Sequence, residues 1–267
     1  MWIKIIKSTF WGLFITGVLL ILSLTNRKHN EQISALPNIF IKINGENAFL
    51  TQKELLNRLK RQGYVFDNQT MKNVKINTIE QSIEKMSEVK EVSVYKSINN
   101  SWNIDILLRK PIARIFNRYG ESFYVDEEGY SMSTSPLYTA RVLVFTGDIK
   151  DRKSEINVEK IINNRTLKTK FFLDDIYRIS YYVCSSPFWS SLLGQVHIEK
   201  NGDMIMIPQV GDFKIIFGKA NNTKEVKEKM DKLWLFYSNA LPYEGWNKYQ
   251  EINLKFKKQI VCKKKLE

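Results

Sequence analysis

Cysteine and histidine are scarce in this chain, which contains only 2 of each in 267 residues. Two cysteines, Cys184 and Cys262, are too few for a disulfide framework, and their spacing does not decide whether they pair. Cysteines and histidines also do not recur at the short intervals of a structural zinc site. These shortages exclude small disulfide-stapled folds and zinc modules.

Catalytic signatures are missing as well: the chain has no Gly-x-Ser-x-Gly, P-loop or Gly-x-Gly-x-x-Gly motif. His197 and Glu199 share one strand face and Asp203 follows the turn, but this spacing favours surface polar residues over a metal site. The acidic stretch Asp126–Glu128 is typical of a solvated hairpin turn. Asp174–Asp175 fits the start of a helix. We therefore expect no catalytic residues, no metal and no cofactor.

Negative charge is in short supply, with 28 Asp and Glu against 41 Lys and Arg and a net charge of +13. An Arg-rich arm, zinc-finger spacing and an RNP motif are all absent, so the sequence does not favour nucleic-acid binding. The surplus instead predicts a basic solvated surface and an acidic protein partner, with binding that salt weakens. Lysines cluster near the C-terminus, at Lys255, Lys257, Lys258, Lys263, Lys264 and Lys265.

A single long apolar run is present, Ser8–Asn26, and it contains no charged residue. Its length just reaches the roughly 20 residues that a membrane span needs. We expect an uncleaved anchor that follows a cytoplasmic tail (residues 1–7) and precedes a linker (27–36). A cleaved signal peptide is the alternative, because Lys4 and Lys7 form a positive start. However, the run is too long and lacks a clean Ala-x-Ala site.

A first folded unit is expected over residues 37–111. The apolar stretch Ile39–Ile43 predicts a strand that ends at the turn signal Asn44–Gly45. Two capping boxes, Thr51–Glu54 and Thr78–Gln81, each predict the start of a helix, because the paired side chains satisfy free amide groups there.

Two alternating stretches, 92–98 and 102–108, flank Asn99–Asn100 and predict a hairpin with one buried face. The resulting order is strand, helix, helix, strand, strand. This order resembles the POTRA (polypeptide-transport-associated) module, whose small sheet keeps an exposed edge that a partner strand can extend.

A second unit is expected over 112–262, followed by a basic tail (263–267). The pattern predicts three short strands, two helices, a hairpin around Asn201–Gly202, a further strand and a helix from a Thr223 cap. Alternation at Ile252, Leu254 and Phe256 predicts a closing strand that continues toward Cys262. The fold class is therefore α+β: an N-terminal transmembrane helix, a small POTRA-like domain, then a larger mixed α/β domain with an extended antiparallel sheet ending on an edge strand.

Several short segments, taken in their order along the chain, resemble landmarks of the FtsQ/DivIB family of bacterial cell-division proteins. No single one is diagnostic, but together they cover the chain. They are Arg109–Arg114, Phe123–Gly129, Phe188–Trp189, Ile207–Gly211, Ile215–Gly218 and Ile252–Phe256.

The resemblance implies a non-enzymatic divisome scaffold in the bacterial inner membrane, single-pass, with its N-terminus inside and its bulk periplasmic or extracytoplasmic, at the division septum. The implied partners are FtsB-like and FtsL-like proteins, and possible further division proteins through the POTRA-like domain. FtsB would add a strand to the C-terminal strand, where the chain carries Lys264 in place of the family's late aromatic contact. The implied partner-binding residues are Ile252, Leu254, Phe256, Lys258, Gln259 and Ile260.

Two other classes of protein fit parts of the sequence. A POTRA-containing envelope export or assembly component would need barrel strands, and none follow Lys265 in this sequence. A membrane-tethered envelope enzyme would need a nucleophile or metal set, which the motif search does not provide.

Overall fold

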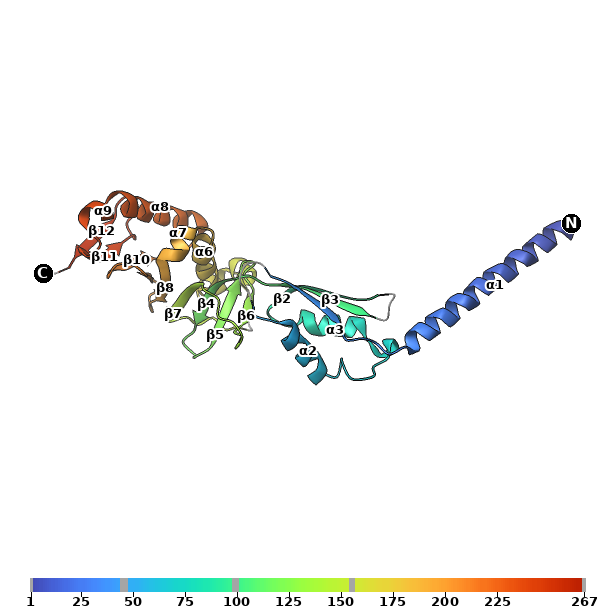
Figure 1. Ribbon diagram of the computed structural model, residues 1–267. Coiled ribbons are helices and arrows are strands. Elements are labelled where there is room, and N and C mark those ends of the chain that lie inside the picture. Colours follow the sequence, from blue (N-terminus) through green and yellow to red (C-terminus); the bar gives the residue numbers. More distant parts are fainter. Residues whose placement is uncertain (1, 44–47, 98–100, 154–156, 266–267) are drawn as a thin grey trace. The chain divides into compact units, whose positions relative to one another are not determined.

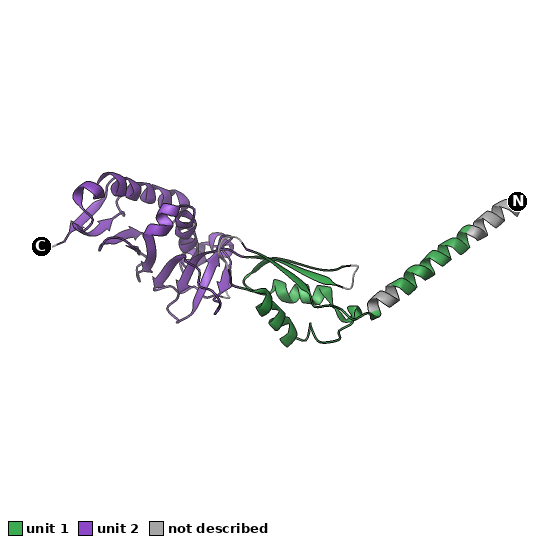
Figure 2. Cartoon of the chain, viewed as in Figure 1, with its two compact units in different colours: residues 1–42, 50–108 green, residues 43–49, 109–267 purple. Residues whose placement is uncertain are grey.

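The structure, a computed structural model, describes the backbone of residues 2–43, 48–97, 101–153 and 157–265; within residues 1–30, side chains are described only for 11–25. The turns expected at Asn44–Gly45 and Asn99–Asn100 lie outside the described residues. The chain divides into two compact units, residues 1–42 with 50–108 and residues 43–49 with 109–267 (Figure 2).

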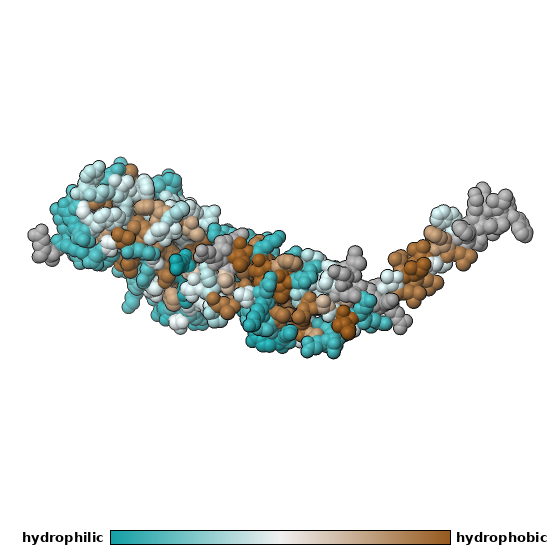
Figure 3. All heavy atoms as spheres, viewed as in Figure 1, coloured by the Kyte–Doolittle hydropathy of each residue, from teal (hydrophilic) through white to brown (hydrophobic). Residues whose placement is uncertain are grey.

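The first element is α1 (Trp2–Glu31), one helix of 30 residues. Its described large apolar side chains, from Trp11 to Leu24, are 40–74% exposed and form the brown band on this helix in Figure 3. The structure corrects the expected membrane span over Ser8–Asn26: within the described residues, no helix is long and apolar enough to cross a bilayer.

The remainder of the first unit follows the predicted order of strands and helices. Strand β3 lies between the other two strands, parallel to β1 and antiparallel to β2. The predicted order of strand, helix, helix, strand, strand is therefore confirmed. The elements are β1 (Asn38–Lys42), α2 (Gln52–Arg61), a single 3₁₀ turn η1 (Met71–Asn73), α3 (Ile76–Glu84), β2 (Val89–Lys96) and β3 (Trp102–Leu108).

Only one of the two predicted capping boxes begins a helix. The Thr51 hydroxyl accepts the Glu54 N–H at 3.2 Å, so the first box is confirmed as the start of α2. The second box is wrong, because α3 begins earlier, at Ile76, behind a Lys75 cap that makes no side-chain hydrogen bond. The Thr78 hydroxyl thus lies inside the first turn, where it cannot act as the cap.

The core of the first unit depends on the alternation of β3. Trp102, Ile104, Ile106 and Leu108 are all buried, as period-two patterning predicts for a sheet with one covered face. The covering helices contribute the other half of this core. Their buried side chains are Leu55 and Leu59 from α2 and Ile79 and Ile83 from α3.

Within the residues that the structure describes, the second unit has one sheet of nine strands. Their order across the sheet is β12-β11-β10-β9-β8-β7-β4-β5-β6. The strands are β4 (Pro111–Phe116), β5 (Ser122–Asp126), β6 (Ser131–Ser133), β7 (Leu143–Gly147), β8 (Leu193–Ile198), β9 (Met204–Pro208), β10 (Lys214–Gly218), β11 (Tyr249–Asn253) and β12 (Val261–Lys264). The helices are α4 (Val158–Ile162), α5 (Arg165–Lys168), α6 (Leu173–Cys184), α7 (Pro187–Leu192), α8 (Thr223–Asn239) and α9 (Leu241–Glu244).

This sheet is mixed, which corrects the expected antiparallel sheet. Strand β7 runs parallel to both of its neighbours, β4 and β8, and β10 runs parallel to β11, whereas the other neighbouring pairs are antiparallel. Parallel neighbours need a crossover connection. Helices α4 to α7 form the crossover from β7 to β8, and α8 and α9 form the one from β10 to β11.

The crossover helices α6, α7 and α8 lie together on one face of the sheet (Figure 1). They bury one apolar core with the strands beneath them, in which Phe145, Phe217, Ile176 and Leu233 are fully covered. Apolar area removed from water in this way is the main stabilising term of the unit. Near β9 and β12 the opposite face is more open, and Ile207 and Val261 are each 42% exposed there.

One acidic stretch behaves differently from the solvated turn that the sequence predicts. Asp126 is only 1% exposed, so that interpretation is wrong for this residue. Its carboxylate accepts the N–H groups of Glu128 and Tyr130 and forms an ion pair with Arg109 at 2.7 Å. Burial raises the pKa of Asp126, and the Arg109 contact opposes that rise. The turn is thus held by a buried, paired charge.

For two helices in the second unit, the predicted start lies at or within one residue of the observed start. The cap of α8 is Asn222, whose side chain accepts the Glu225 N–H at 2.9 Å, one residue before the expected Thr223. Asp174 and Asp175 lie in the first turn of α6, as predicted, and both pair with Arg178.

The start of α6 also depends on a distant carboxylate. Asp151 is 3% exposed and accepts the N–H of Phe172 at 3.0 Å and that of Leu173 at 3.0 Å. It therefore satisfies amide donors that the helix itself leaves free. Burial raises the pKa of Asp151 to about 6, against the opposing effect of these two hydrogen bonds.

Replacing Tyr237 by Phe should stabilise the second unit. The Tyr237 hydroxyl is buried and has no hydrogen-bond partner among the described residues. A buried unpaired hydroxyl costs roughly 1–3 kcal/mol, so Tyr237→Phe should raise the free energy of unfolding by about 1 kcal/mol in urea denaturation. The matched control is Tyr177→Phe, which removes a hydroxyl that donates to Glu127 O at 2.9 Å and should lower it. Equal effects from both variants would contradict this account.

Stability should fall between pH 4 and pH 7 because of Asp151. A pKa of about 6 in the folded chain, above the usual 3.8, means that the folded state holds a proton that the unfolded state has lost. This contribution, up to about 3 kcal/mol, is fully present below the unfolded pKa and is lost as pH rises through the folded pKa. Urea denaturation across this range should show a flatter profile for Asp151→Asn than for wild type. An unchanged slope in the variant would refute the assignment.

Candidate functional site

Strand β12 forms the C-terminal edge of the nine-stranded sheet. Within the described residues it pairs with β11 alone, in antiparallel register, with Cys262 opposite Ile252 and Val261 opposite Asn253. The pairing continues past the strand, where Lys265 N donates to Lys248 O at 3.0 Å. The other side of β12 is therefore the side on which a further strand can be added.

The closing strand predicted from the alternation at 252–256 is wrong in one respect: it is two strands. Strand β11 ends at Asn253, and β12 begins at Val261 and turns back along it. Of the predicted partner-binding residues, Ile252 and Leu254 are fully buried, and Phe256 is 47% exposed in the connection. Lys258 and Gln259 are exposed in the same connection, and Ile260 packs partly against the core. Their role in binding stays a prediction.

The connection between β11 and β12 is held to the sheet and to α8. Leu254 N donates to Ile216 O in β10 at 2.9 Å, so the backbone continues to bond after β11 ends. The Lys232 ammonium group donates to Leu254 O at 3.2 Å and to Phe256 O at 2.5 Å. Burial, with a smaller effect of nearby Lys229, lowers the pKa of Lys232. These contacts fix where the chain turns back into β12.

The direction of each N–H in β12 follows from two hydrogen bonds. Lys265 N points to β11, and N–H groups alternate sides along a strand, so those of Lys263 and Val261 also point inward. The N–H groups of Cys262 and Lys264 then point away from the sheet. Leu254 N points to β10 and gives the same alternation along β11. Among the described residues, no group is bonded to these two outward N–H groups.

The other sheet edges are less available. In the first unit, Glu80 accepts the outward N–H of Val94 in β2 at 2.8 Å, and Gln52 donates to Ile39 O in β1 at 2.7 Å. At the far edge of the nine-stranded sheet, β6 has only three residues, and its Met132 is buried. Side-chain caps and short strands are common ways to block strand addition. Strand β12 is thus the most open edge that the structure describes.

Positive charge gathers at this edge. Lys263 and Lys264 are exposed and form no ion pair with any described residue, while Lys265 pairs with Asp212 at 2.8 Å. The side chains of Lys263 and Val261 point to the open face, and those of Lys264 and Cys262 point to the helix face. Burial raises the pKa of the Cys262 thiol, which keeps it neutral.

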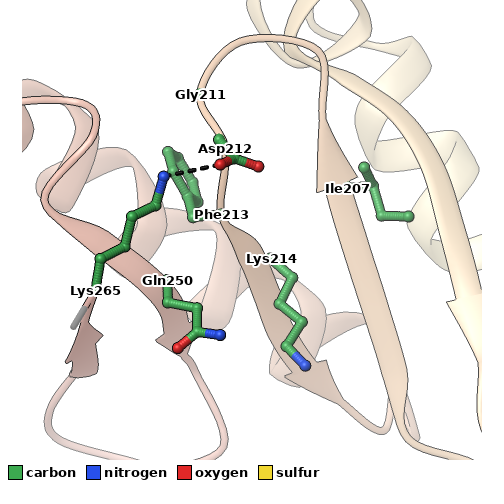
Figure 4. Close-up of a pocket in the computed structure, with 7 residues that line it drawn as sticks. All are labelled: Ile207, Gly211, Asp212, Phe213, Lys214, Gln250 and Lys265. Atoms are coloured by element: carbon green, nitrogen blue, oxygen red, sulfur yellow. Dashed lines mark hydrogen bonds and ion pairs between the residues drawn. The ribbon is translucent and has the colours of Figure 1, made fainter. Parts of the chain in front are cut away.

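A surface pocket of about 720 Å³ borders the edge on the open face (Figure 4). Its apolar lining comes from Ile207 in β9 and Phe213 before β10, and its polar lining from the Asp212–Lys265 pair and the Lys214 ammonium group. The remaining lining residues are Gly211 and Gln250. Lys214 in turn pairs with Glu251 at 3.0 Å. The pocket therefore combines an apolar wall with two cations.

Other candidate chemistry is not assembled by the fold. In the part of the chain that the structure describes, no three His, Cys, Asp or Glu side chains gather as a metal site. His197 lies 3.3 Å from the Thr146 hydroxyl on β7, which is a polar pair across two strands. Cys184 and Cys262 are both free, so they do not form a disulfide.

Two family comparisons cover most of the chain outside α1. One family, described as FtsQ/DivIB, C-terminal related, matches residues 110–263, and a POTRA-like domain matches residues 37–107. The first match spans more than half of the chain. The chain belongs to the FtsQ/DivIB C-terminal related family. A search of curated proteins finds no match.

The FtsQ/DivIB resemblance and the POTRA resemblance drawn from short sequence segments are both confirmed by these matches. The family match ends at residue 263, so it covers the first three residues of β12 and stops before Lys264. Together the two domains support a division-related scaffold role that depends on protein–protein interaction.

The alternation along β12 predicts opposite results for two adjacent prolines. Lys263→Pro removes an N–H that points to β11 and should disrupt the pairing of β12 with β11. Lys264→Pro removes an N–H that points away from the sheet and should leave this pairing intact. Hydrogen exchange of the β11 amides should be faster in Lys263→Pro than in Lys263→Ala. For Lys264→Pro it should match Lys264→Ala. If Lys264→Pro exposed β11 equally, the assignment of outward N–H groups would be wrong.

Proposed function

We propose that this chain is a non-enzymatic scaffold of the bacterial divisome that binds and positions FtsB-like and FtsL-like proteins at the septum. The observation that carries the proposal is the open backbone edge of β12, a strand whose first three residues lie in the region that matches the FtsQ/DivIB family. A scaffold needs a surface that holds a partner in one orientation, and an unpaired strand edge is such a surface.

The proposed mechanism is strand addition at β12. A partner strand bonds to the outward N–H and C=O groups of Cys262 and Lys264, and these main-chain bonds provide affinity. Specificity comes from side chains on alternate faces. Phe256, Lys258 and Gln259 lie exposed in the connection that leads into this strand and extend the contact surface. Ile252 and Leu254 support it from beneath, because both are fully buried.

The proposed site of action is the extracytoplasmic side of the cytoplasmic membrane at the division septum, which rests on membership of the FtsQ/DivIB family. The POTRA-like domain is proposed to bind further division proteins. Side chains cap backbone groups on both of its outer strands, so those contacts would use side-chain surfaces instead of strand addition.

Photo-crosslinking in the cell tests this function. A crosslinking amino acid at Lys264 should give an adduct with a short division protein, identified by mass spectrometry, because an added strand would lie beside this position. Lys264→Pro, with the crosslinker at Val261, should lose the adduct, whereas Lys264→Ala should keep it. Depletion of the chain should give long cells without septa.

The control is a crosslinker at Phe66, which is 50% exposed in the first unit. Adducts from Phe66 with none from Val261 or Lys264 would move the binding surface to the POTRA-like domain. Adducts only to export components, together with outer-membrane defects on depletion, would favour a POTRA-containing export or assembly component.

A further inference from the structure

One ion pair connects the C-terminal edge to a turn far away in the sequence. The Lys265 ammonium group lies 2.8 Å from a carboxylate oxygen of Asp212, in the turn between β9 and β10 (Figure 4). Asp212 is 92% exposed, so its carboxylate is not part of the core. The Lys265 contact lowers the pKa of Asp212. The edge thus already holds one carboxylate, supplied by the chain itself.

The lysine that holds this carboxylate lies where a partner side chain can reach it. Lys265 follows β12 and shares the open face with Lys263 and Val261, because side chains alternate along a strand. When a strand is added, its side chains lie about 5 Å from those directly opposite. A carboxylate on the open face of an added strand would therefore come within reach of Lys265, next to the pocket lined by Phe213.

The charge around the edge decides which partner fits. Lys263 and Lys264 form no ion pair with the described residues, and the whole chain carries +13. Like charges opposite each other destabilise a strand pair, and opposite charges stabilise it. A second copy of this chain would place lysines against lysines. An extended segment rich in Asp or Glu would meet three lysines instead.

We propose that Asp212 is an internal place-holder, and that an acidic partner strand added to β12 brings a carboxylate that replaces Asp212 on Lys265. The inference rests on the proposed strand addition and identifies the chemistry of its partner. An exposed ion pair is weak, so Asp212 is readily displaced. While it is in place, it competes with acidic segments and lowers their affinity.

The test uses the full chain in detergent and three labelled synthetic peptides of equal length. Each alternates Val with one polar residue, which is Glu, Gln or Lys, and binding is followed by fluorescence anisotropy. Asp212→Asn should tighten binding of the Glu peptide by about two- to fivefold, the range expected for one exposed pair. It should leave the Gln peptide unchanged. In the Lys265→Gln background, Asp212→Asn should have no effect on either peptide.

A matched control separates this local effect from net charge. Glu159→Gln removes one exposed carboxylate from α4, which is not part of the edge, and should leave the Glu peptide unchanged. Equal gains in Glu159→Gln and Asp212→Asn would overturn the inference, as would no binding of the Glu peptide by any variant.

Failure of strand addition itself would look different. If Lys264→Pro leaves Glu-peptide binding intact, the peptide attaches to the lysines without extending the sheet, and the proposed strand addition fails. If Lys264→Pro abolishes binding of all three peptides and Asp212→Asn changes none of them, strand addition stands and the place-holder is wrong.

Discussion

A strand at the edge of a sheet leaves one row of N–H and C=O groups without a neighbouring strand, and this constraint organises the whole chain. In the first unit, side chains bond to some of these groups: Glu80 accepts an N–H of one outer strand, and Gln52 donates to a C=O of the other. At the far edge of the sheet in the second unit, the outer strand β6 is very short, which leaves few groups exposed. Among the edges that the structure describes, β12 is the most open, and it carries lysines.

Those lysines make the open edge selective. Lys263 and Lys264 form no ion pair with any described residue, so their charges would oppose pairing between copies of the chain and would favour the acidic strand that we propose. The edge also needs a firm base. Leu254 bonds to β10, and Lys232 of α8 bonds to the turn before β12, so the connection to the outermost strand is attached both to the sheet and to a helix. The charged residues of β12 and the connection that these contacts hold are therefore close together in the chain.

Two errors of sequence interpretation share a cause. Alternation at Ile252, Leu254 and Phe256 predicted one strand. Leu254 is buried, but it follows the end of β11, and its N–H donates to β10. Alternation records which residues are covered, not which strand covers them. The prediction for Asp126 was wrong for a similar reason, because its buried charge is stabilised by Arg109 and by the N–H groups of Glu128 and Tyr130. The sheet was expected to be antiparallel although the predicted helices between strands already indicated crossovers.

By itself, the sequence determined the order of elements in the first unit, the helix start at Thr51, the family and the basic character of the C-terminal end. These depend on local patterns, such as period, capping spacing and composition, that hold before the chain folds. Only the tertiary structure decided which strand is the outermost, which N–H groups of β12 point outward, and that Asp212 meets Lys265. Strand neighbours and long-range ion pairs join residues far apart in the chain, as in this pair 53 positions apart, and no local pattern encodes them.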